Sequence, residues 1–331
     1  MAAVISCVIP VYNAQATLPA AVESVLGQSY PYFELLLVDN ASTDQSAAVC
    51  AGYARQDDRV RLLTQPKKGA AAARNAGLAA ATGRYLTFVD ADDILRPGAF
   101  EALARAGAAG PDVISFGFEH CGPAGRSAAV YPAFQCDLAG FWPHFVGYYQ
   151  HEQFFSLCNK AYRLALIRQQ GLTFDEALRT GEDIAFNFAF WPRIGSIAHL
   201  GESYYEYWVH PSTLTHSPTL DNLATSARVL AQLRDFLQAA GQPQLFPPLL
   251  DSQLPYDAAC FYTLLLDYTK PYTPAQRAQG LAQLYGSEPW HAALQKGLAA
   301  APGLYGRWLR LTARCKSPWL ATLPLRLRGR L

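Results

Sequence analysis

The sequence has few charged residues and no long apolar run. Charged side chains make up 16% of its 331 residues, against about 25% in typical soluble proteins. A membrane-spanning helix needs about 20 apolar residues, whereas the best candidate, Ala258 to Leu266, is bracketed by Asp257 and Asp267. The first residues also lack the charged segment of a secretory signal. These absences predict a cytoplasmic protein without a membrane span. The hydrophobic content of 51% predicts a large core.

The seven cysteines lack the spacing of disulfide or metal motifs. None occurs as Cys-X-X-Cys, and their number is odd, which argues against a disulfide framework and against a structural zinc site. Cys7 lies inside an apolar, strand-like run, so we expect a small buried hydrophobic residue there. This usage of cysteine is typical of a reducing compartment.

Acidic residues are absent after Glu288, although eight bases follow it. Trp and Leu alternate with these bases from Tyr305 onward, a pattern typical of helices on anionic membrane surfaces. The alternative is a helix packed on its own domain with a solvated basic edge. No nucleic-acid-binding module is recognisable. We favour peripheral association with the inner face of the cell membrane.

Apolar strand-like runs and helical patterns alternate over the first 118 residues. The strand-like runs are Val4–Ile9, Glu34–Asp39, Val60–Leu63, Tyr85–Val89 and Val113–Phe118, and the helical patterns are Thr17–Gln28, Ser42–Arg55, Gly69–Ala81 and Pro97–Ala108. Most of these runs are apolar on both faces, as parallel strands are. The alternation predicts an α/β fold with a doubly wound, mostly parallel sheet flanked by helices.

The second half of the chain predicts a different organisation. Residues 122–150 form a loose connection rich in Pro and aromatics, after which Lys160–Gln170 and Glu182–Phe190 read as helices and Ile197–His199 and Ser203–Val209 as short strands. Beyond Pro218 the patterns are helical, with candidates at Leu220–Ala240, Leu249–Tyr268, Pro274–Tyr285 and Tyr305–Arg314. We therefore expect a first domain over 1–215 and a helical region over 216–331, which could supply a surface for a homodimer.

Three carboxylates directly follow the fourth apolar run. Asp90, Asp92 and Asp93 come after Tyr85–Val89, where the carboxyl end of a strand opens into the ligand crevice of an α/β domain. Clustered carboxylates repel one another unless a cation lies among them. A divalent cation that carries phosphates is the usual solution. The sequence therefore predicts a metal site at this strand end.

Two other strand ends and one basic turn face the same predicted edge. Pro10 closes the first strand and Asp39 the second. For Asp39 the alternative role is helix capping. The turn at Lys68 leads into an Ala-rich helix that carries Arg74, and this segment is neither a P-loop nor a Gly-X-Gly-X-X-Gly motif, so phosphate would have to be held by a cation. Arg74 can point toward the acidic crevice, the alternative being a solvated helix arginine.

A second acidic pair opens a later helix. Glu182 and Asp183 follow Gly181. The plain interpretation is that they complement the helix macrodipole; the functional one is a general base aimed at the crevice. His210 follows a strand and precedes Pro211, so it is structural or a third protein ligand of the metal.

Taken together, five motifs resemble family 2 glycosyltransferases of the GT-A fold, of the bacterial cell-surface polysaccharide type. The motifs are Val8–Asn13, Leu37–Asp44, Ala73–Gly77, Phe88–Asp93 and Gly181–Asp183, in this order. The resemblance covers about residues 3–215, and the segment Phe155–Arg163 is similar to the acceptor side of bacterial polysaccharide members. The chain departs from the pattern at Pro66–Gly69, where members often carry Asn before the Gly.

The resemblance implies roles for individual residues. A uridine nucleotide would be bound by Pro10, Val11, Tyr12, Asn13 and Asp39, with Asp39 accepting from the ring N–H, and the donor site would be completed by Lys68, Arg74, Asp90 and Ala91. Asp92, with His210, would ligate the Mn²⁺ or Mg²⁺ that bridges the diphosphate. Asp183 would be the catalytic base, with Glu182 beside it contacting the acceptor.

The implied activity is inverting, metal-dependent transfer of a single sugar from a UDP-sugar to a hydroxyl of a cell-surface glycan, which could be lipid-linked. Two alternatives stay open. A nucleotidyltransferase would also use paired aspartates and Mg²⁺, but it would carry a Gly- and Arg/Lys-rich triphosphate loop early in the chain, where Pro10–Asn13 stands instead. A non-catalytic module that binds nucleotide sugars would be favoured by broken acidic pairs, and both pairs are intact.

Overall fold

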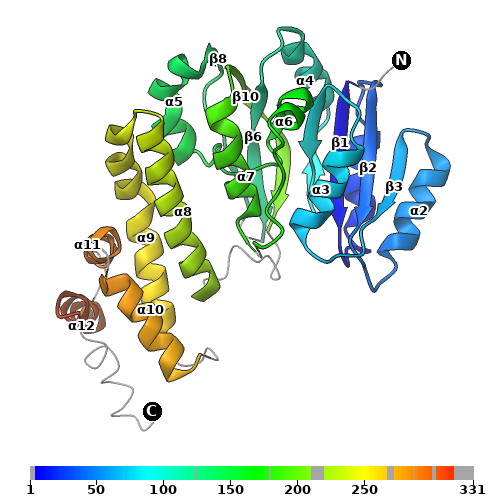
Figure 1. Cartoon of the computed structure of the whole chain (residues 1–331). Coiled ribbons are helices and arrows are strands. Elements are labelled where there is room, and N and C mark those ends of the chain that lie inside the picture. Colours follow the sequence, from blue (N-terminus) through cyan, green and yellow to red (C-terminus); the bar gives the residue numbers. More distant parts are fainter. Residues whose placement is uncertain are drawn as a thin grey trace. The chain divides into compact units, whose positions relative to one another are not determined.

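The structure, a computed structural model, describes residues 4–123, 125–178, 180–209, 220–266, 272–286, 288–299 and 303–316. Its contacts divide the chain into two compact units, Met1–Ser212 and Thr213–Leu331. The first unit is built on a β-sheet and the second consists of helices (Figure 1).

One mixed sheet organises the first unit. Its strands are β1 (Ile5–Val11), β2 (Phe33–Asp39), β3 (Val60–Thr64), β4 (Tyr85–Phe88), β5 (Ile94–Leu95), β6 (Val113–Gly122), β7 (Gly125–Ala129), β8 (Phe134–Asp137), β9 (Lys160–Arg163) and β10 (Ser196–Trp208). They lie in the order β3-β2-β1-β4-β9-β6-β10-β5, with β7 on β6 and β8 on β10. The pairs β1–β2, β2–β3, β1–β4 and β6–β10 are parallel. The predicted α/β fold with a doubly wound, mostly parallel sheet is therefore confirmed.

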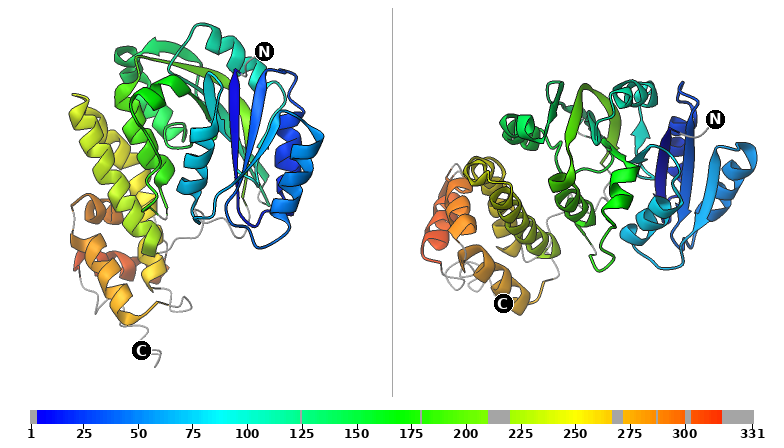
Figure 2. Two further views of the ribbon diagram at one scale, coloured as in Figure 1. Left: turned by 45° about the vertical axis from the view of Figure 1, so that its right-hand side comes forward. Right: turned by 45° about the horizontal axis from the view of Figure 1, so that its top comes forward.

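Helices lie on both faces of this sheet (Figure 2). They are α1 (Leu18–Leu26), α2 (Ser46–Gln56), α3 (Ala70–Ala80), α4 (Ala99–Ala108), α5 (Leu138–Gln150), α6 (Leu164–Gln169) and α7 (Glu182–Phe190). Helix α3 approaches β1 closely because Gly77 has no side chain: a Cβ there would lie 2.4 Å from Cγ1 of Val8. Small residues on α3 thus place this helix directly against the centre of the sheet.

Three predictions of local structure were wrong. Lys160–Gln170 is not one helix, because its first four residues form β9 between β4 and β6 and only Leu164–Gln169 is helical. The segment 122–150 is not an irregular connection, since it contains β7, β8 and α5. The two short strands after Ile197 are one strand, β10, whose register on β6 shifts near Ser203. For β9 and β10 the prediction was wrong because pairing with strands distant in the sequence determines their structure.

The core of the first unit follows the apolar runs. Every residue of β2 is buried, and β1 is buried except at Pro10, as expected for central parallel strands. Cys7 is fully buried, so its predicted role as a small hydrophobic residue is confirmed. Burial also raises the pKa of its thiol above the usual range.

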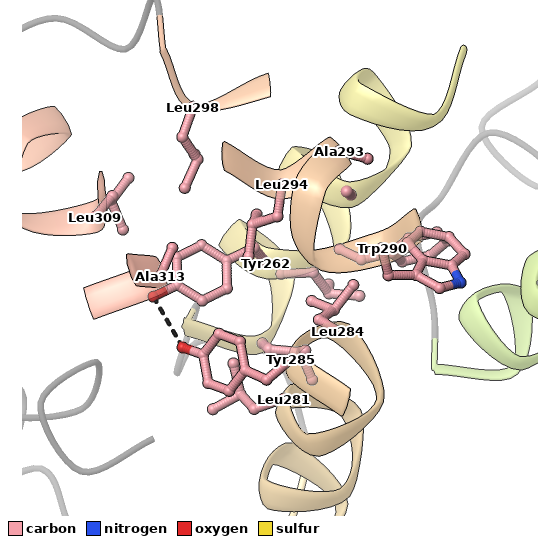
Figure 3. Close-up of a cluster of buried hydrophobic side chains, with 14 of the residues drawn as sticks. Tyr262, Leu281, Leu284, Tyr285, Trp290, Ala293, Leu294, Leu298, Leu309 and Ala313 are labelled. Atoms are coloured by element: carbon pink, nitrogen blue, oxygen red, sulfur yellow. Dashed lines mark hydrogen bonds between the residues drawn. The ribbon is translucent and has the colours of Figure 1, made fainter. Parts of the chain in front are cut away.

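The second unit has its own hydrophobic core (Figure 3). Its helices are α8 (Leu220–Ala239), α9 (Phe246–Leu266), α10 (Pro274–Gly286), α11 (Glu288–Gly297) and α12 (Gly303–Arg314). Hydroxyl groups connect three of them inside this core, because Tyr285 donates to Tyr262 at 3.2 Å and Tyr262 lies 2.6 Å from the hydroxyl of Thr312. The predicted helical C-terminal region is confirmed, although α11 was not predicted. Among the described residues no helix is long and apolar enough to span a membrane.

Candidate functional site

The candidate site lies where β1, β2 and β4 end and α7 begins. These strand ends carry Pro10, Asp39 and the loop after Phe88. Parallel strands bring their carboxyl ends to one edge of the sheet. Helix α7 contacts α3, and Glu182 in its first turn pairs with Arg74 of α3, so this turn lies at the same edge.

Arg74 joins the two acidic motifs. Its side chain is buried on α3, where one guanidinium nitrogen, Nη2, lies 3.2 Å from Oδ1 of Asp90 and the other, Nη1, donates to Oε1 of Glu182. Burial alone would lower the pKa of the guanidinium, but the carboxylates of Asp90 and Glu182 raise it above its usual value. Arg74 is therefore a fixed cation between the loop after β4 and the start of α7, and not a solvated helix arginine.

Asp39 is a buried carboxylate with an unused acceptor. The residue is 6% exposed, and its Oδ1 has no hydrogen-bond partner among the described residues. It does not cap α2, which begins at Ser46 without a side-chain cap. A buried acceptor without a donor is costly, so this oxygen is suited to accept a hydrogen bond from a ligand.

The neighbouring loops form the surroundings of Asp39. The side chain of Asn40 donates to the carbonyl of Gly69 at 2.7 Å and accepts from its N–H at 3.0 Å, which fixes the turn before α3. Lys68 in this turn lies over the ring of Tyr12, with Nζ 5.3 Å from the ring centroid. Tyr12 is 50% exposed, so it presents an aromatic face for a planar ligand.

The short segment around Tyr12 is locally constrained. Val11 is buried at the end of β1, and Asn13 adopts a positive φ of 50°. The side-chain oxygen of Asn13 accepts from the N–H of Thr43 at 2.8 Å. These contacts join the end of β1 to the loop after β2 and hold the two predicted nucleotide-binding segments next to each other.

The three carboxylates after β4 lie in different environments. Asp90 is half-buried against Arg74 and accepts from the thiol of Cys158 at 3.5 Å. Asp92 is exposed, and Ala91 between them is buried. Asp93 is buried, and it accepts from Tyr205 Oη at 2.7 Å and from the N–H of Trp208 at 2.8 Å. Asp92 is thus the exposed residue of the three.

Burial and the nearby charge of Asp90 raise the pKa of Asp93 to about 8. Burial and the charge of Asp93 also hold the pKa of the Tyr205 phenol well above its usual value, so the phenol keeps its proton. Asp93 therefore belongs to the interior of the protein rather than to an exposed set of acids.

Asp183 opens α7 next to Glu182. The helix is preceded by Gly181 in the left-handed region, with φ 78°, which glycine adopts without strain. Asp183 is half-buried, and its Oδ1 accepts from the N–H of Ile184 at 2.8 Å. Burial and the charge of Glu182 raise the pKa of Asp183 to about 6, although Arg74 opposes this shift. A carboxylate with such a pKa can act as a base near neutral pH.

His210 lies outside the described residues, two positions after Trp208. A different group of potential ligands, Glu119, Cys121 and Glu206, lies close enough to share an ion. Arg126 pairs with both of these glutamates, so the acids already have a cationic partner. We do not assign a metal to that group.

Three residues of this region had no individual role assigned from the sequence, although Cys158 and Lys160 lie in the segment Phe155–Arg163. Cys158 and Tyr205 contact the acidic loop. Lys160 is buried, and its ammonium donates to the carbonyls of Gln153 and Ser156, both at 2.5 Å. Burial lowers the pKa of Lys160 well below its usual value. The aromatic run at 204–208 was visible, but which of its residues faces inward depends on the shifted register of β10.

Comparisons with known proteins identify the family to which the chain belongs. The family model "Glycosyl transferase family 2" matches residues 6–172. The glycosyltransferase EpsJ of Bacillus subtilis is 28% identical over 66% of this chain and 64% of its own length. The succinoglycan biosynthesis protein ExoO of Rhizobium meliloti is 32% identical over 54% of this chain and 53% of its own length. The chain thus matches less than two thirds of the length of these relatives.

Solved structures share the fold. Residues 1–349 of TarS from S. aureus, in complex with UDP-GlcNAc, superpose with a TM-score of 0.69 at 20% identity, over 99% of this chain and 92% of that one. The mannosyltransferase PcManGT from Pyrobaculum calidifontis, in complex with GDP-Man and Mn²⁺, has a TM-score of 0.52 at 18% identity, over 100% of this chain and 89% of that one. The match of the family model over half of the chain confirms the resemblance found in the sequence: this chain belongs to glycosyltransferase family 2 and has the GT-A fold.

Proposed function

We propose that the protein is an inverting, metal-dependent glycosyltransferase that moves one sugar from a UDP-sugar to a hydroxyl of a cell-surface glycan. The observation that carries the proposal is the double contact of Arg74 with Asp90 and Glu182. This contact keeps the acidic loop after β4 next to the first turn of α7, as transfer between a bound donor and an activated acceptor requires.

The donor nucleotide is assigned to the edge formed by β1 and β2. The unpartnered oxygen of Asp39 would accept from the ring N–H of uracil, and the exposed face of Tyr12 would stack on the base. Lys68 and Arg74 would face the diphosphate and the sugar. The complexes of TarS with UDP-GlcNAc and with UDP support a uridine nucleotide.

A divalent cation is assigned to Asp92, with His210 as the further ligand predicted from the sequence. The donor set fits Mn²⁺ or Mg²⁺, because these cations prefer carboxylate oxygens and Asp92 is exposed at the end of β4. When bound, such a cation neutralises charge on the departing diphosphate. The Mn²⁺ complex of PcManGT supports this assignment.

Asp183 is assigned as the catalytic base. Its raised pKa lets it accept a proton from the acceptor hydroxyl near neutral pH. The oxygen so activated attacks the anomeric carbon from the face opposite the diphosphate, so the configuration inverts and no covalent enzyme intermediate forms. Glu182, which is held by Arg74, would contact the acceptor. The similarity to ExoO supports a polysaccharide as the acceptor.

A screen of nucleotide sugars tests this function. Each UDP-sugar is incubated with the protein and Mn²⁺ or with EDTA, and UDP release is measured. We expect UDP to be released from at least one UDP-sugar in the presence of Mn²⁺ and not in the presence of EDTA. Binding without release would favour a non-catalytic module, and pyrophosphate release from a nucleoside triphosphate would favour a nucleotidyltransferase.

We also propose that the outer face of α12 binds an anionic membrane surface. The inner face of the helix is anchored, because Leu309, Thr312 and Ala313 are buried in the core of the second unit. On the opposite face Leu311 is 57% exposed, between exposed Arg307 and Arg314. An apolar residue flanked by bases suits the headgroup region of anionic lipids.

Reversing the charges at Arg307 and Arg314 to Glu is expected to weaken membrane binding. Each base near an anionic surface contributes about 1 kcal/mol, so the double reversal should lower the affinity by at least roughly 30-fold. Flotation with phosphatidylcholine vesicles, with and without phosphatidylserine, measures this change. Reversal of exposed Arg55 and Arg234 is the matched control. Equal binding of both double variants to the anionic vesicles would contradict the proposal.

A further inference from the structure

The loop that carries Asp92 is held by β10 more than by its own strand. On one side, the N–H of Val89 donates to the carbonyl of Val8 at 3.0 Å, which ends the pairing with β1. On the other side, Ile94 and Leu95 form β5 and pair with Glu206 and Tyr205 of β10. Residues 90–93 therefore form a turn between two separate points of attachment.

One phenol contacts this turn twice. Tyr205 Oη accepts from the backbone N–H of Asp90 at 3.1 Å and donates to Oδ2 of Asp93 at 2.7 Å. The other oxygen of Asp93 accepts from the N–H of Trp208 at 2.8 Å. Tyr205 is 2% exposed and Asp93 1% exposed, so water does not compete for these bonds. The turn is completed by the N–H of Asp93, which donates to the carbonyl of Asp90 at 3.1 Å.

These contacts separate the roles of the three acids. Asp93 points into the protein, and both of its oxygens are used by β10. Asp90 is held by Arg74 on its side chain and by Tyr205 on its backbone. Asp92 lies between these two fixed neighbours and is exposed. Asp92 is thus carried by a turn whose two ends are bound to one phenol.

From this arrangement we infer that Tyr205 and Asp93 are positioning residues for the metal site: they orient Asp92 toward the cation without touching it. The inference rests on the proposed function, because it assumes that Asp92 binds the metal. Loss of a group that orients a metal-ligating residue without touching the metal typically lowers metal affinity by about 10- to 100-fold. A merely structural pair would affect the stability of the fold and leave the metal affinity of the folded protein unchanged.

The test is a calorimetric titration of the full chain with Mn²⁺ in the presence of UDP. Tyr205→Phe removes only the phenol oxygen, and we expect Mn²⁺ to bind about tenfold or more weakly, while UDP binds equally well in EDTA. Tyr204→Phe is the matched control, because its phenol is on the neighbouring residue and donates to Glu202 instead. We expect this variant to bind Mn²⁺ like the wild type.

A second variant, Asp93→Ala, removes both acceptors for β10 and is expected to weaken Mn²⁺ binding in the same way. Folding of each variant is checked by thermal unfolding in EDTA. A folded Tyr205→Phe or Asp93→Ala protein that binds Mn²⁺ within about twofold of the wild type would overturn the positioning role while leaving the proposed function intact. A wild-type protein that binds UDP equally with Mn²⁺ and with EDTA would overturn both.

Discussion

Replacement of Asp183 by asparagine is expected to abolish sugar transfer while UDP binding survives. The amide keeps the size of the side chain and its bond from the N–H of Ile184, but it cannot accept the proton of an attacking hydroxyl. Removal of a general base typically lowers the rate by about 10²- to 10⁴-fold. The measurement is Mn²⁺-dependent release of UDP from the donor identified by the screen, together with UDP affinity by calorimetry.

Asp58→Asn is the control for this variant, because Asp58 is an exposed acid in the turn before β3, away from the strand ends that form the site. It makes the same change of charge and should leave the rate unchanged. If Asp183→Asn retained a rate close to that of the wild type, Asp183 would not be the base. If it lost UDP binding as well, the effect would lie in the donor site instead.

The second large effect is expected for Asp92→Ala. Asp92 is the exposed acid of its motif and the proposed metal ligand, so its loss should remove the gain in UDP affinity that Mn²⁺ provides. Lewis-acid contacts to a diphosphate are worth several kcal/mol, and about 1.4 kcal/mol is a factor of ten in affinity. The variant should therefore bind UDP at least about tenfold more weakly than the wild type in Mn²⁺.

In EDTA the Asp92→Ala and wild-type proteins should bind UDP alike, because Asp39 and Tyr12 are unchanged. Asp58→Ala serves as the control for the loss of one acid. An Mn²⁺-dependent gain in UDP affinity that survives in Asp92→Ala would show that the cation is held elsewhere. The assignment of the acidic loop as the metal site would then be wrong.

The alternation of apolar runs and helical patterns was enough to predict the fold class. The parallel strands β1, β2 and β4 are buried almost throughout, so their sequences are mostly apolar and easy to recognise. The antiparallel strand β9 was missed, because Lys160–Arg163 contains two cationic residues and only its pairing with β4 and β6 makes it a strand. Lys160 is buried there against carbonyl oxygens, a compensation that a local pattern does not reveal.

In the candidate site, too, some features were predictable from the sequence and others were not. The acids at strand ends could be found from the sequence, since an acid directly after a buried strand has few structural roles. The contact of Arg74 with Glu182 spans 108 positions, and the contact of Tyr205 with Asp93 spans 112. Such contacts depend on how the sheet brings distant segments together, so they could only be seen in the structure. They also give Asp93 a buried role on β10, which the sequence did not indicate.

The pH dependence of the rate tests the central claim most directly, namely that Asp183 is the base of a single displacement. Burial and Glu182 raise the pKa of Asp183 to about 6, and only the deprotonated form accepts a proton. We therefore expect the turnover number to fall about tenfold per pH unit below about pH 6 and to level off above it, while UDP affinity in Mn²⁺, measured at the same pH values, changes less. A turnover number that stays constant from about pH 7 down to about pH 5, with the protein still folded and binding UDP, would contradict the claim.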